Sequence, residues 1–293
     1  SRSEATANTS ATATIPTPVA PASAIGSRPA APRVVWGVTK APAIHHVRPR
    51  LGGVPAAGIL IDASTGEVMW SRNAWERRPI ASLTKMMNAL VAVDRASPSK
   101  RVRVSPRAAA MGGSTVGGLP SGGTMRVGSL LRGMMIVSGN DAANALADAL
   151  GPGARRYVAR MNSKARSMGL RCTRFTSPEG LDEGNRSCAH DLALIAREVL
   201  ADPALRSTVG KRWDRITRGW NGSKLLRNRN PLLQRGVAGV TGVKTGHTGP
   251  AGWCLVASAT RGGHSLISVM LGEDERAWQT QRLLAAGFAA LSR

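Results

Sequence analysis

The sequence is short of the residues from which several kinds of site are built. Its 293 residues include three cysteines without a C-x-x-C pair and five histidines without metal-ligand spacing, so we expect no structural metal. Two phenylalanines and one tyrosine are too few for a platform that stacks nucleic-acid bases, and no zinc-finger or helix-turn-helix spacing occurs. We therefore expect no specific nucleic-acid partner. No apolar run approaches the roughly 18 residues that span a membrane.

Acidic residues are scarce as well, with 17 Asp and Glu against 40 Lys and Arg and a formal net charge of +23. A surface of this sign attracts polyanions. Anionic cell-wall polymers or an anionic membrane surface are therefore candidate partners, and a general bias of the composition toward arginine and alanine is the alternative explanation. Because the chain starts at Ser1 without a methionine, we also expect that an export signal has been removed.

Residues 1–53 show no hydrophobic period. They are rich in Ala, Pro, Ser and Thr and contain seven of the 17 prolines. Such a composition buries too little apolar surface to offset the entropy lost on ordering the chain. We expect a disordered N-terminal tether over 1–53 and a single folded domain over 54–293.

The folded domain alternates between strand and helix patterns. Runs of apolar and β-branched residues predict strands over 57–62, 67–70, 242–246, 252–259 and 265–270. Apolar residues at helical spacing predict helices that begin at Ser82 and cover 127–137, 141–150, 155–168, 191–200 and 277–291. The glycine-rich stretch 111–123 lacks the G-K-[ST] ending of a phosphate loop and is interpreted as turns. A tight turn between the last two strands indicates an antiparallel sheet.

The helix that begins at Ser82 carries the first candidate site. Ser82 and Lys85 are three residues apart and share one helix face, with the hydroxyl within reach of the amine. A neutral lysine can take the proton of a serine nucleophile, and burial in this apolar helix lowers the lysine pKa. The helix N-terminus also favours a developing oxyanion. A serine and a solvated lysine at an ordinary helix start have the same spacing, so the pair alone does not decide.

Two further motifs follow, Ser138-Gly139-Asn140 and Lys244-Thr245-Gly246. In this order the three motifs resemble those of the penicillin-binding serine acyltransferases, and most closely those of the low-molecular-mass D-alanyl-D-alanine carboxypeptidases. The resemblance covers about 54–293 and is strongest in the strings 80–87, 138–146, 175–181 and 242–248. It implies a β-lactamase/transpeptidase-like α+β fold, in which helices flank an antiparallel sheet of about five strands and a helical subdomain carries Ser82 and Ser138.

This resemblance also implies an activity. The enzyme would remove the terminal D-alanine of peptidoglycan stem peptides that end in D-Ala-D-Ala, through an acyl-enzyme and without a cofactor, and β-lactams would inhibit it. Ser82 is then the nucleophile and Lys85 its base. Ser138 passes a proton between Lys85 and the leaving amine, and Asn140 donates to the substrate amide and holds Lys85 in place.

The third motif is expected to bind the substrate. By the same resemblance, Lys244 and Thr245 on an edge strand meet the free carboxylate, and the Lys244 charge helps to lower the pKa of Lys85. Gly246 leaves room for the substrate backbone, and the backbone N–H groups of Ser82 and His247 hold the oxyanion. An exported protein, at the cell wall or the outer face of the cytoplasmic membrane, is the matching location.

Several alternatives stay open at this point. A DD-endopeptidase shares all three motifs, whereas a β-lactamase of the common type needs an E-x-x-x-N motif that is missing between Lys85 and Lys244. A non-enzymatic cell-wall-binding module is less consistent with three intact motifs. Where the family commonly has a histidine and a Ser-Thr-Ala run, this chain has residues 185–189, so that Cys172 and Cys188 flank one loop. A disulfide between them, which suits an oxidising compartment, and three unpaired thiols are both compatible with the sequence.

Overall fold

The computed structural model describes residues 47–151 and 153–292. Most of the predicted tether, residues 1–46, lies outside the described residues. Within the two described ranges, no helix combines the length and the apolar content that crossing a bilayer requires.

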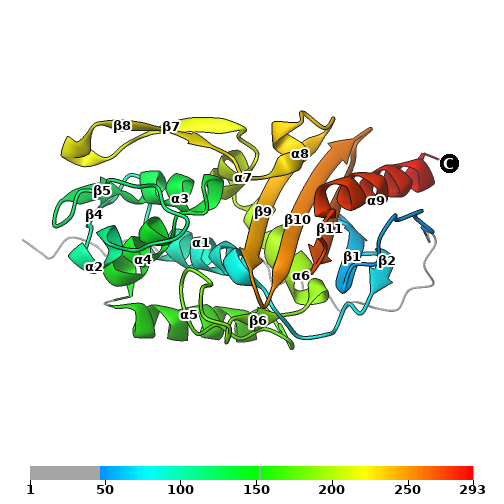
Figure 1. Ribbon diagram of the computed structural model, residues 1–293, viewed down its shortest axis with the longest axis horizontal. Helices are drawn as coiled ribbons and strands as arrows, with labels where there is room; N and C mark the ends of the chain where they lie inside the picture. The colour runs from blue at the N-terminus through cyan, green and yellow to red at the C-terminus, as the bar shows by residue number, and fades with distance from the viewer. Residues whose placement is uncertain (1–46, 152, 293) are drawn as a thin grey trace, which may run out of the picture. The chain divides into compact units, whose positions relative to one another are not determined.

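The centre of the fold is a five-stranded antiparallel sheet with the strand order β2-β1-β11-β10-β9 (Figure 1). Its strands are β1 (Ala57–Asp62), β2 (Val68–Arg72), β9 (Val240–Thr248), β10 (Gly252–Arg261) and β11 (His264–Leu271). The predicted α+β fold and its antiparallel sheet of about five strands are therefore confirmed. β9, the strand with the third motif, lies at one edge of the sheet.

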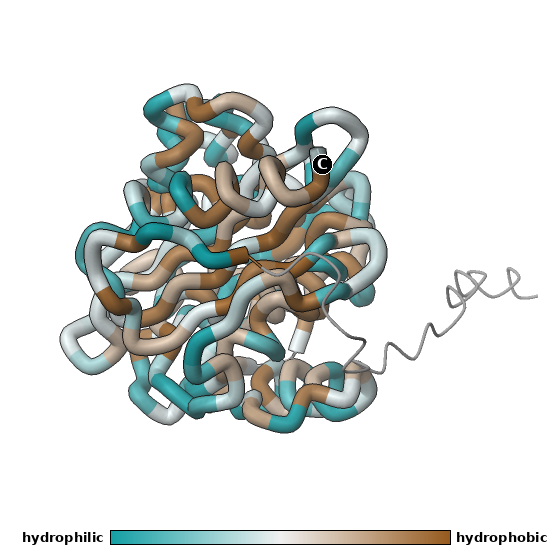
Figure 2. Tube along the Cα trace, turned by 90° about the vertical axis from the view of Figure 1, so that its right-hand side faces the viewer, coloured by the Kyte–Doolittle hydropathy of each residue, from teal (hydrophilic) through white to brown (hydrophobic). Residues whose placement is uncertain are grey.

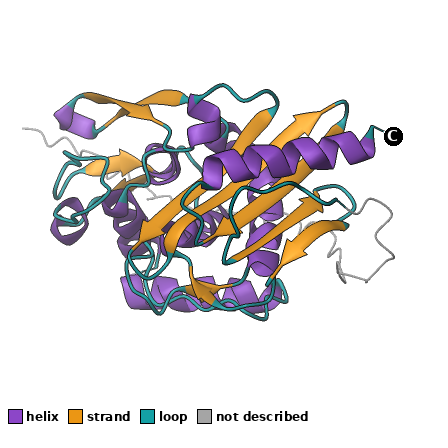
Figure 3. Cartoon of the chain, turned by 45° about the vertical axis from the view of Figure 1, so that its right-hand side comes forward, coloured by secondary structure: helices purple, strands orange, loops and turns teal. Residues whose placement is uncertain are grey.

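Helices cover both faces of the sheet (Figure 3). α9 (Arg276–Leu291) packs on one face, and α6 (Ala189–Ala201) packs on the other. Successive residues of β11 show the alternation that a pleated strand imposes, because Ile267 belongs to the core shared with α6 whereas Leu266 belongs to the core shared with α9. The hydrophobic segments accordingly run through the middle of the fold in Figure 2. Burial on both faces explains why β1 has no polar side chain before Asp62.

The helical part is built around α1 (Thr84–Arg95), which contacts α3 (Val127–Ile136), α4 (Asn140–Leu150) and α5 (Ala154–Ser167). Nine residues of α1 are buried, including polar ones, so its hydrophobic period reports a central helix. The helices predicted in this part are confirmed, with ends that differ by one or two residues. A 3-10 turn, η1 (Ala81–Leu83), precedes α1, so Ser82 stands in this turn and Lys85 in the first turn of the helix.

Several short elements have no counterpart among the sequence-based predictions, because each is too short or too polar to show a hydrophobic period. They are β3 (Arg78–Pro79), β4 (Arg101–Arg103), α2 (Pro106–Ala109), β5 (Thr124–Arg126), β6 (Arg186–Ser187), α7 (Pro203–Val209), β7 (Trp213–Thr217), η2 (Gly219–Asn221), β8 (Ser223–Arg227) and α8 (Pro231–Gln234). The three short helices still carry a readable signal, because a proline follows a capping Ser105, Asp202 or Asn230 in each.

Residues 47–53, assigned to the tether by sequence, contact the folded part. The Val47 N–H donates to the Met69 carbonyl at 3.0 Å, and the Val47 side chain is buried in the core beneath α9. The Gly52 N–H donates to Gln279 Oε1 at 3.1 Å. The folded part therefore begins at or before Val47, because short contacts at a few positions order this segment although its composition shows no period.

A disulfide joins Cys172 and Cys188, with their Cα atoms 5.6 Å apart. The structure thus has the first of the two cysteine arrangements that the sequence left open. Cys254 is a buried free thiol in β10. The bridge closes a loop over residues 172–188, which runs beside the second motif described below.

Candidate active site

The Lys85 amine lies at the centre of the site. It is completely buried, and Nζ lies 2.7 Å from Ser82 Oγ, 2.8 Å from Asn140 Oδ1 and 2.6 Å from the Glu179 carbonyl oxygen. The Asn140 amide is oriented by its nitrogen, which donates to the Gly112 carbonyl at 2.9 Å. Asn140 Oδ1 and the Glu179 carbonyl can therefore only accept. A neutral amine has two N–H groups for these two acceptors, which leaves its lone pair for the Ser82 hydroxyl proton.

Burial is the main cause that lowers the pKa of Lys85 to about 7. Glu179 and Asp141 act in the opposite direction, and the cation that lowers this pKa further is Arg229. The sequence had predicted that Lys244 would be this cation. Arg229 follows β8 and is held near the site by its donation to Ser114 Oγ at 2.6 Å. No sequence motif marks this arginine.

The second motif joins the helical part to β9. Ser138 is buried, and the hydrogen bond that the structure shows for its Oγ comes from Lys244 Nζ at 3.0 Å. The sequence placed Ser138 between Lys85 and the leaving amine. Because Lys244 donates to it, the Ser138 hydroxyl proton remains available for another acceptor. Ser138 is therefore positioned to contact both the third motif and an incoming group.

Lys244 is as buried as Lys85 but has different neighbours. Its Nζ donates to Ser138 Oγ and to the Thr245 carbonyl at 2.8 Å. Burial lowers the pKa of Lys244 well below its usual value, and the nearby cations Lys85 and Arg229 add to that effect. A carboxylate is the group that would restore the charged form of this amine.

Gly246 allows β9 to approach Ser82. A Cβ at this position would lie 3.0 Å from the Ile80 carbonyl oxygen and 3.3 Å from the Ser82 nitrogen. Only a residue without a side chain keeps the strand this close to the predicted oxyanion donors. His247 follows directly, and its ring packs against Trp253 with the ring centroids 3.9 Å apart and the planes tilted by 34°, so the side chain has a packing role beside the strand.

Two residues of the site have unusual backbone conformations. Ala81, just before Ser82, and Ser138 both have positive φ, at 48° and 62°. Such a conformation costs a non-glycine residue about 1–3 kcal/mol and is concentrated at functional sites. The strain thus marks the same two motifs that the sequence singled out.

The sequence model of the D-alanyl-D-alanine carboxypeptidase family matches residues 54–275 of this chain. The chain belongs to this family. D-alanyl-D-alanine carboxypeptidase DacF of Bacillus subtilis is 37% identical over 242 residues, which are 80% of this chain and 62% of DacF. DacB2 of Mycobacterium tuberculosis is 37% identical over 216 residues, which are 73% of either chain. The chain thus spans about 62% of the length of DacF.

Solved structures agree with this family membership. The crystal structure of D-alanyl-D-alanine carboxypeptidase from Mycobacterium tuberculosis superposes with a TM-score of 0.77 at 33% identity, covering 83% of this chain and 96% of that one. An S96A mutant of the Streptomyces K15 DD-transpeptidase gives a TM-score of 0.76 at 29% identity, with 83% and 100% coverage.

The family site of this chain includes residues that the three motifs did not name. Asp141 follows the second motif, and its carboxylate accepts from the Val116 and Gly117 N–H groups, both at 2.9 Å. The Asn140 N–H donates to the Ser114 carbonyl at 2.7 Å. The glycine-rich stretch 111–123 does form turns, as predicted, and these turns hold Asn140 in place. Asp141 was readable as the residue next to the motif, but its role depends on this packing.

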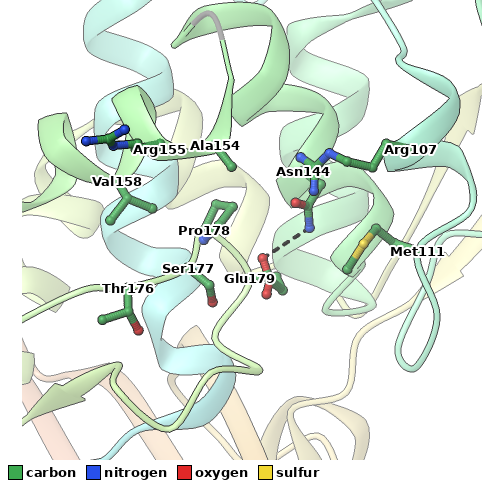
Figure 4. Close-up of a pocket in the computed structure, with 10 residues that line it drawn as sticks. All are labelled: Arg107, Met111, Asn144, Ala154, Arg155, Val158, Thr176, Ser177, Pro178 and Glu179. Atoms are coloured by element: carbon green, nitrogen blue, oxygen red, sulfur yellow. Dashed lines mark hydrogen bonds between the residues drawn. The ribbon is translucent and has the colours of Figure 1, made fainter.

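A cavity of about 350 Å³ lies beside Glu179 (Figure 4). The residues that line it come from α2 and the loop after it, from α4 and α5, and from the 172–188 loop: Arg107, Met111, Asn144, Ala154, Arg155, Val158, Thr176, Ser177, Pro178 and Glu179. Asn144 Nδ2 donates to Glu179 Oε2 at 3.1 Å across one wall. The Glu179 main chain thus faces Lys85 while its carboxylate borders this cavity.

Proposed function

We propose that this protein is a serine-type D-Ala-D-Ala carboxypeptidase that removes the terminal D-alanine of peptidoglycan stem peptides. The observation that carries the proposal is the position of Lys85 Nζ, which lies within hydrogen-bonding distance of two oxygens that can only accept and of Ser82 Oγ. A neutral amine here donates its two N–H groups to those oxygens, so that its lone pair can accept the Ser82 proton. A buried lysine with a pKa of about 7 and this orientation is a base for a serine nucleophile.

In the proposed acylation, Lys85 takes the Ser82 hydroxyl proton while Oγ attacks the carbonyl carbon between the two D-alanines. The backbone N–H groups of Ser82 and His247 hold the oxyanion. When the C–N bond breaks, the leaving D-alanine takes a proton from protonated Lys85 through the Ser138 hydroxyl. Water then attacks the acyl carbon and gives a proton to Lys85. The bond between the acyl carbon and Ser82 Oγ breaks, and Lys85 returns this proton to Oγ.

Substrate selection is proposed to depend on the terminal carboxylate. Lys244 has two oxygen partners and no carboxylate in the structure. The free carboxylate of D-alanine would supply one, and Thr245 beside it is partly exposed and offers a hydroxyl. Amides without that carboxylate should therefore be poor substrates, which favours a carboxypeptidase over a general peptidase.

The test measures D-alanine released from a peptide that ends in D-Ala-D-Ala, beside turnover of a chromogenic penicillin analogue. We expect release of D-alanine together with slow turnover of the analogue and a stable adduct on Ser82. Rapid turnover of the analogue without D-alanine release would make the protein a β-lactamase. Cleavage of cross-linked peptide dimers in preference to D-alanine release would make it an endopeptidase. Ser82→Ala is the control for both reactions.

We further propose that the exported protein lies at the outer face of the membrane and contacts its anionic surface through the β7–β8 hairpin. Trp213 and Leu225 are 64% and 53% exposed. Each is paired across the hairpin with an arginine on the same face, Trp213 with Arg227 and Leu225 with Arg215. Apolar side chains between arginines suit a lipid headgroup boundary.

The protein should sediment with phosphatidylglycerol vesicles more than with phosphatidylcholine vesicles. Trp213→Ala should weaken this binding, whereas Trp278→Ala on α9 should not. If the Trp213 variant bound the vesicles as well as the unmodified protein does, and poly(glycerol phosphate) abolished this binding, a cell-wall polymer would be favoured as the partner.

A further inference from the structure

The Glu179 carboxylate lies in the protein interior, where charged side chains are rare. Its side chain is only 7% exposed, and within the described residues the structure shows no ion pair for it. Arg107 lines the same cavity but pairs with Asp148 at 2.6 Å, and Arg155 lies at the exposed rim. A buried carboxylate without a close cation is costly, so its retention needs a reason.

Two short connections tie Glu179 to the proposed base. The Glu179 carbonyl accepts directly from Lys85 Nζ at 2.6 Å. Its carboxylate accepts from Asn144 Nδ2 (Figure 4). Asn144 Nδ2 also donates to the Asn140 carbonyl at 3.0 Å, and the Asn140 side chain in turn accepts from Lys85. The carboxylate is thus held on the rear side of the Lys85 contacts, where it acts on the amine by charge rather than by taking a proton from Ser82.

Three other titratable groups lie at this centre. Asp141 on α4 is a second carboxylate near Lys85. Arg229 after β8 is a cation of opposite effect, and Lys244 on β9 is a second buried amine whose own pKa is lowered by burial, Lys85 and Arg229. For Lys85, burial and Arg229 favour the neutral amine, and the two carboxylates favour the charged one.

Resting on the function proposed above, we propose that the Glu179 carboxylate is a positioning residue that sets the pH range in which Lys85 exchanges the proton of Ser82. The base must take this proton and later return it to the leaving amine, so neither form of Lys85 can be strongly disfavoured. A negative charge fixed beside the buried amine offsets part of the effect of burial and of Arg229. Without that charge, Lys85 would stay neutral to lower pH but would be a weaker base toward the Ser82 proton.

The experiment compares Glu179→Gln with Glu183→Gln, an exposed glutamate of the same loop that serves as the matched control. Glutamine keeps an oxygen that can accept from Asn144, so mainly the charge is removed. The rate of penicillin acylation is followed by intact mass between pH 5 and 9. We expect the acid limb of Glu179→Gln to move to lower pH by about one unit. Glu183→Gln should follow the unmodified protein.

A purely structural role for Glu179 would reduce the rate at all pH values without moving the limb, and this result would overturn the proposal, as would a shift to higher pH. Glu179→Ala opens onto the existing cavity, so it removes the charge without leaving an enclosed void and must shift the limb in the same direction. The titration of Lys85 is also followed by NMR with labelled lysine, with Lys85→Arg to assign the signal. This readout needs no activity, so an unshifted Lys85 would refute the role of Glu179 even if the protein proved not to be a carboxypeptidase.

Discussion

The first turn of α1 and the middle of β9 each contribute one buried lysine, and the two lysines differ in their neighbours. Lys85 has two carbonyl acceptors, one serine hydroxyl and two carboxylates nearby. Lys244 has a hydroxyl and a carbonyl, and the charged groups that act on it are cations. Equal burial therefore produces a base whose pKa lies near neutrality in one place and an amine that lacks a counter-charge in the other. The neighbours, and not the depth of burial, separate a proton acceptor from a carboxylate-binding group.

Arginine substitutions should separate the two lysines most strongly. Lys85→Arg should slow penicillin acylation about a thousandfold, a barrier increase of about 4 kcal/mol, because arginine does not give up its proton. Lys244→Arg keeps a cation for the carboxylate and should stay within about tenfold in D-alanine release. Acylation rates from intact mass and D-alanine assays test the pair. A near-normal acylation rate in Lys85→Arg would refute its role as the base.

Removal of the disulfide should lower the free energy of unfolding through the loop that contacts Lys85. It closes the loop that carries Glu179, with a sequence separation of 16 residues. A Cys172→Ser/Cys188→Ser double variant should lose about 3 kcal/mol in free energy of unfolding, because a loop of this length is no longer restricted in the unfolded chain. Urea unfolding monitors this loss, with Cys254→Ser as the single-thiol control. An unchanged midpoint would mean that packing alone holds the loop.

Removal of the Lys244 charge should affect binding of the substrate carboxylate. Lys244→Ala should lower kcat/KM for D-alanine release by roughly 10–100-fold, as expected from the loss of a charged hydrogen bond of about 1.5–3 kcal/mol. An ester-capped substrate, which lacks the carboxylate charge, should react slowly with the unmodified protein and show little further loss with the variant. If the ester cap and the Lys244→Ala substitution each lowered kcat/KM and the two losses added, Lys244 would not contact the carboxylate.

The smallest effect concerns pH. Because burial lowers the pKa of Lys85 to about 7, the neutral, proton-accepting form predominates above this pH and is lost below it. The acylation rate should therefore rise with pH through about 7 and fall about tenfold per pH unit on the acid side. Pre-steady-state acylation by penicillin across this range measures the limb. A rate independent of pH between 5 and 8 would contradict Lys85 as the titrating base.

The local parts of this protein follow from its sequence. Ser82 and Lys85 meet because the two residues are three apart at a helix start. The runs that became β1, β10 and β11 are readable because strands buried on both faces consist largely of apolar residues. Family membership followed from the three motifs together. These features depend on contacts between near neighbours in the chain or on composition, so they need no coordinates.

The distant groups that reach the two lysines become known only from the packed fold. Ser138 meets Lys244 across 106 residues and the Glu179 carbonyl meets Lys85 across 94, with no period or spacing to announce either contact. Arg229 acts on both lysines from a segment that carries no motif at all. The pKa of a buried amine is a sum over burial and every nearby charge, and both quantities exist only after the sheet and the helices have packed. The sequence therefore predicted which side chains would react, and the packing determines the charges and the burial that act on them.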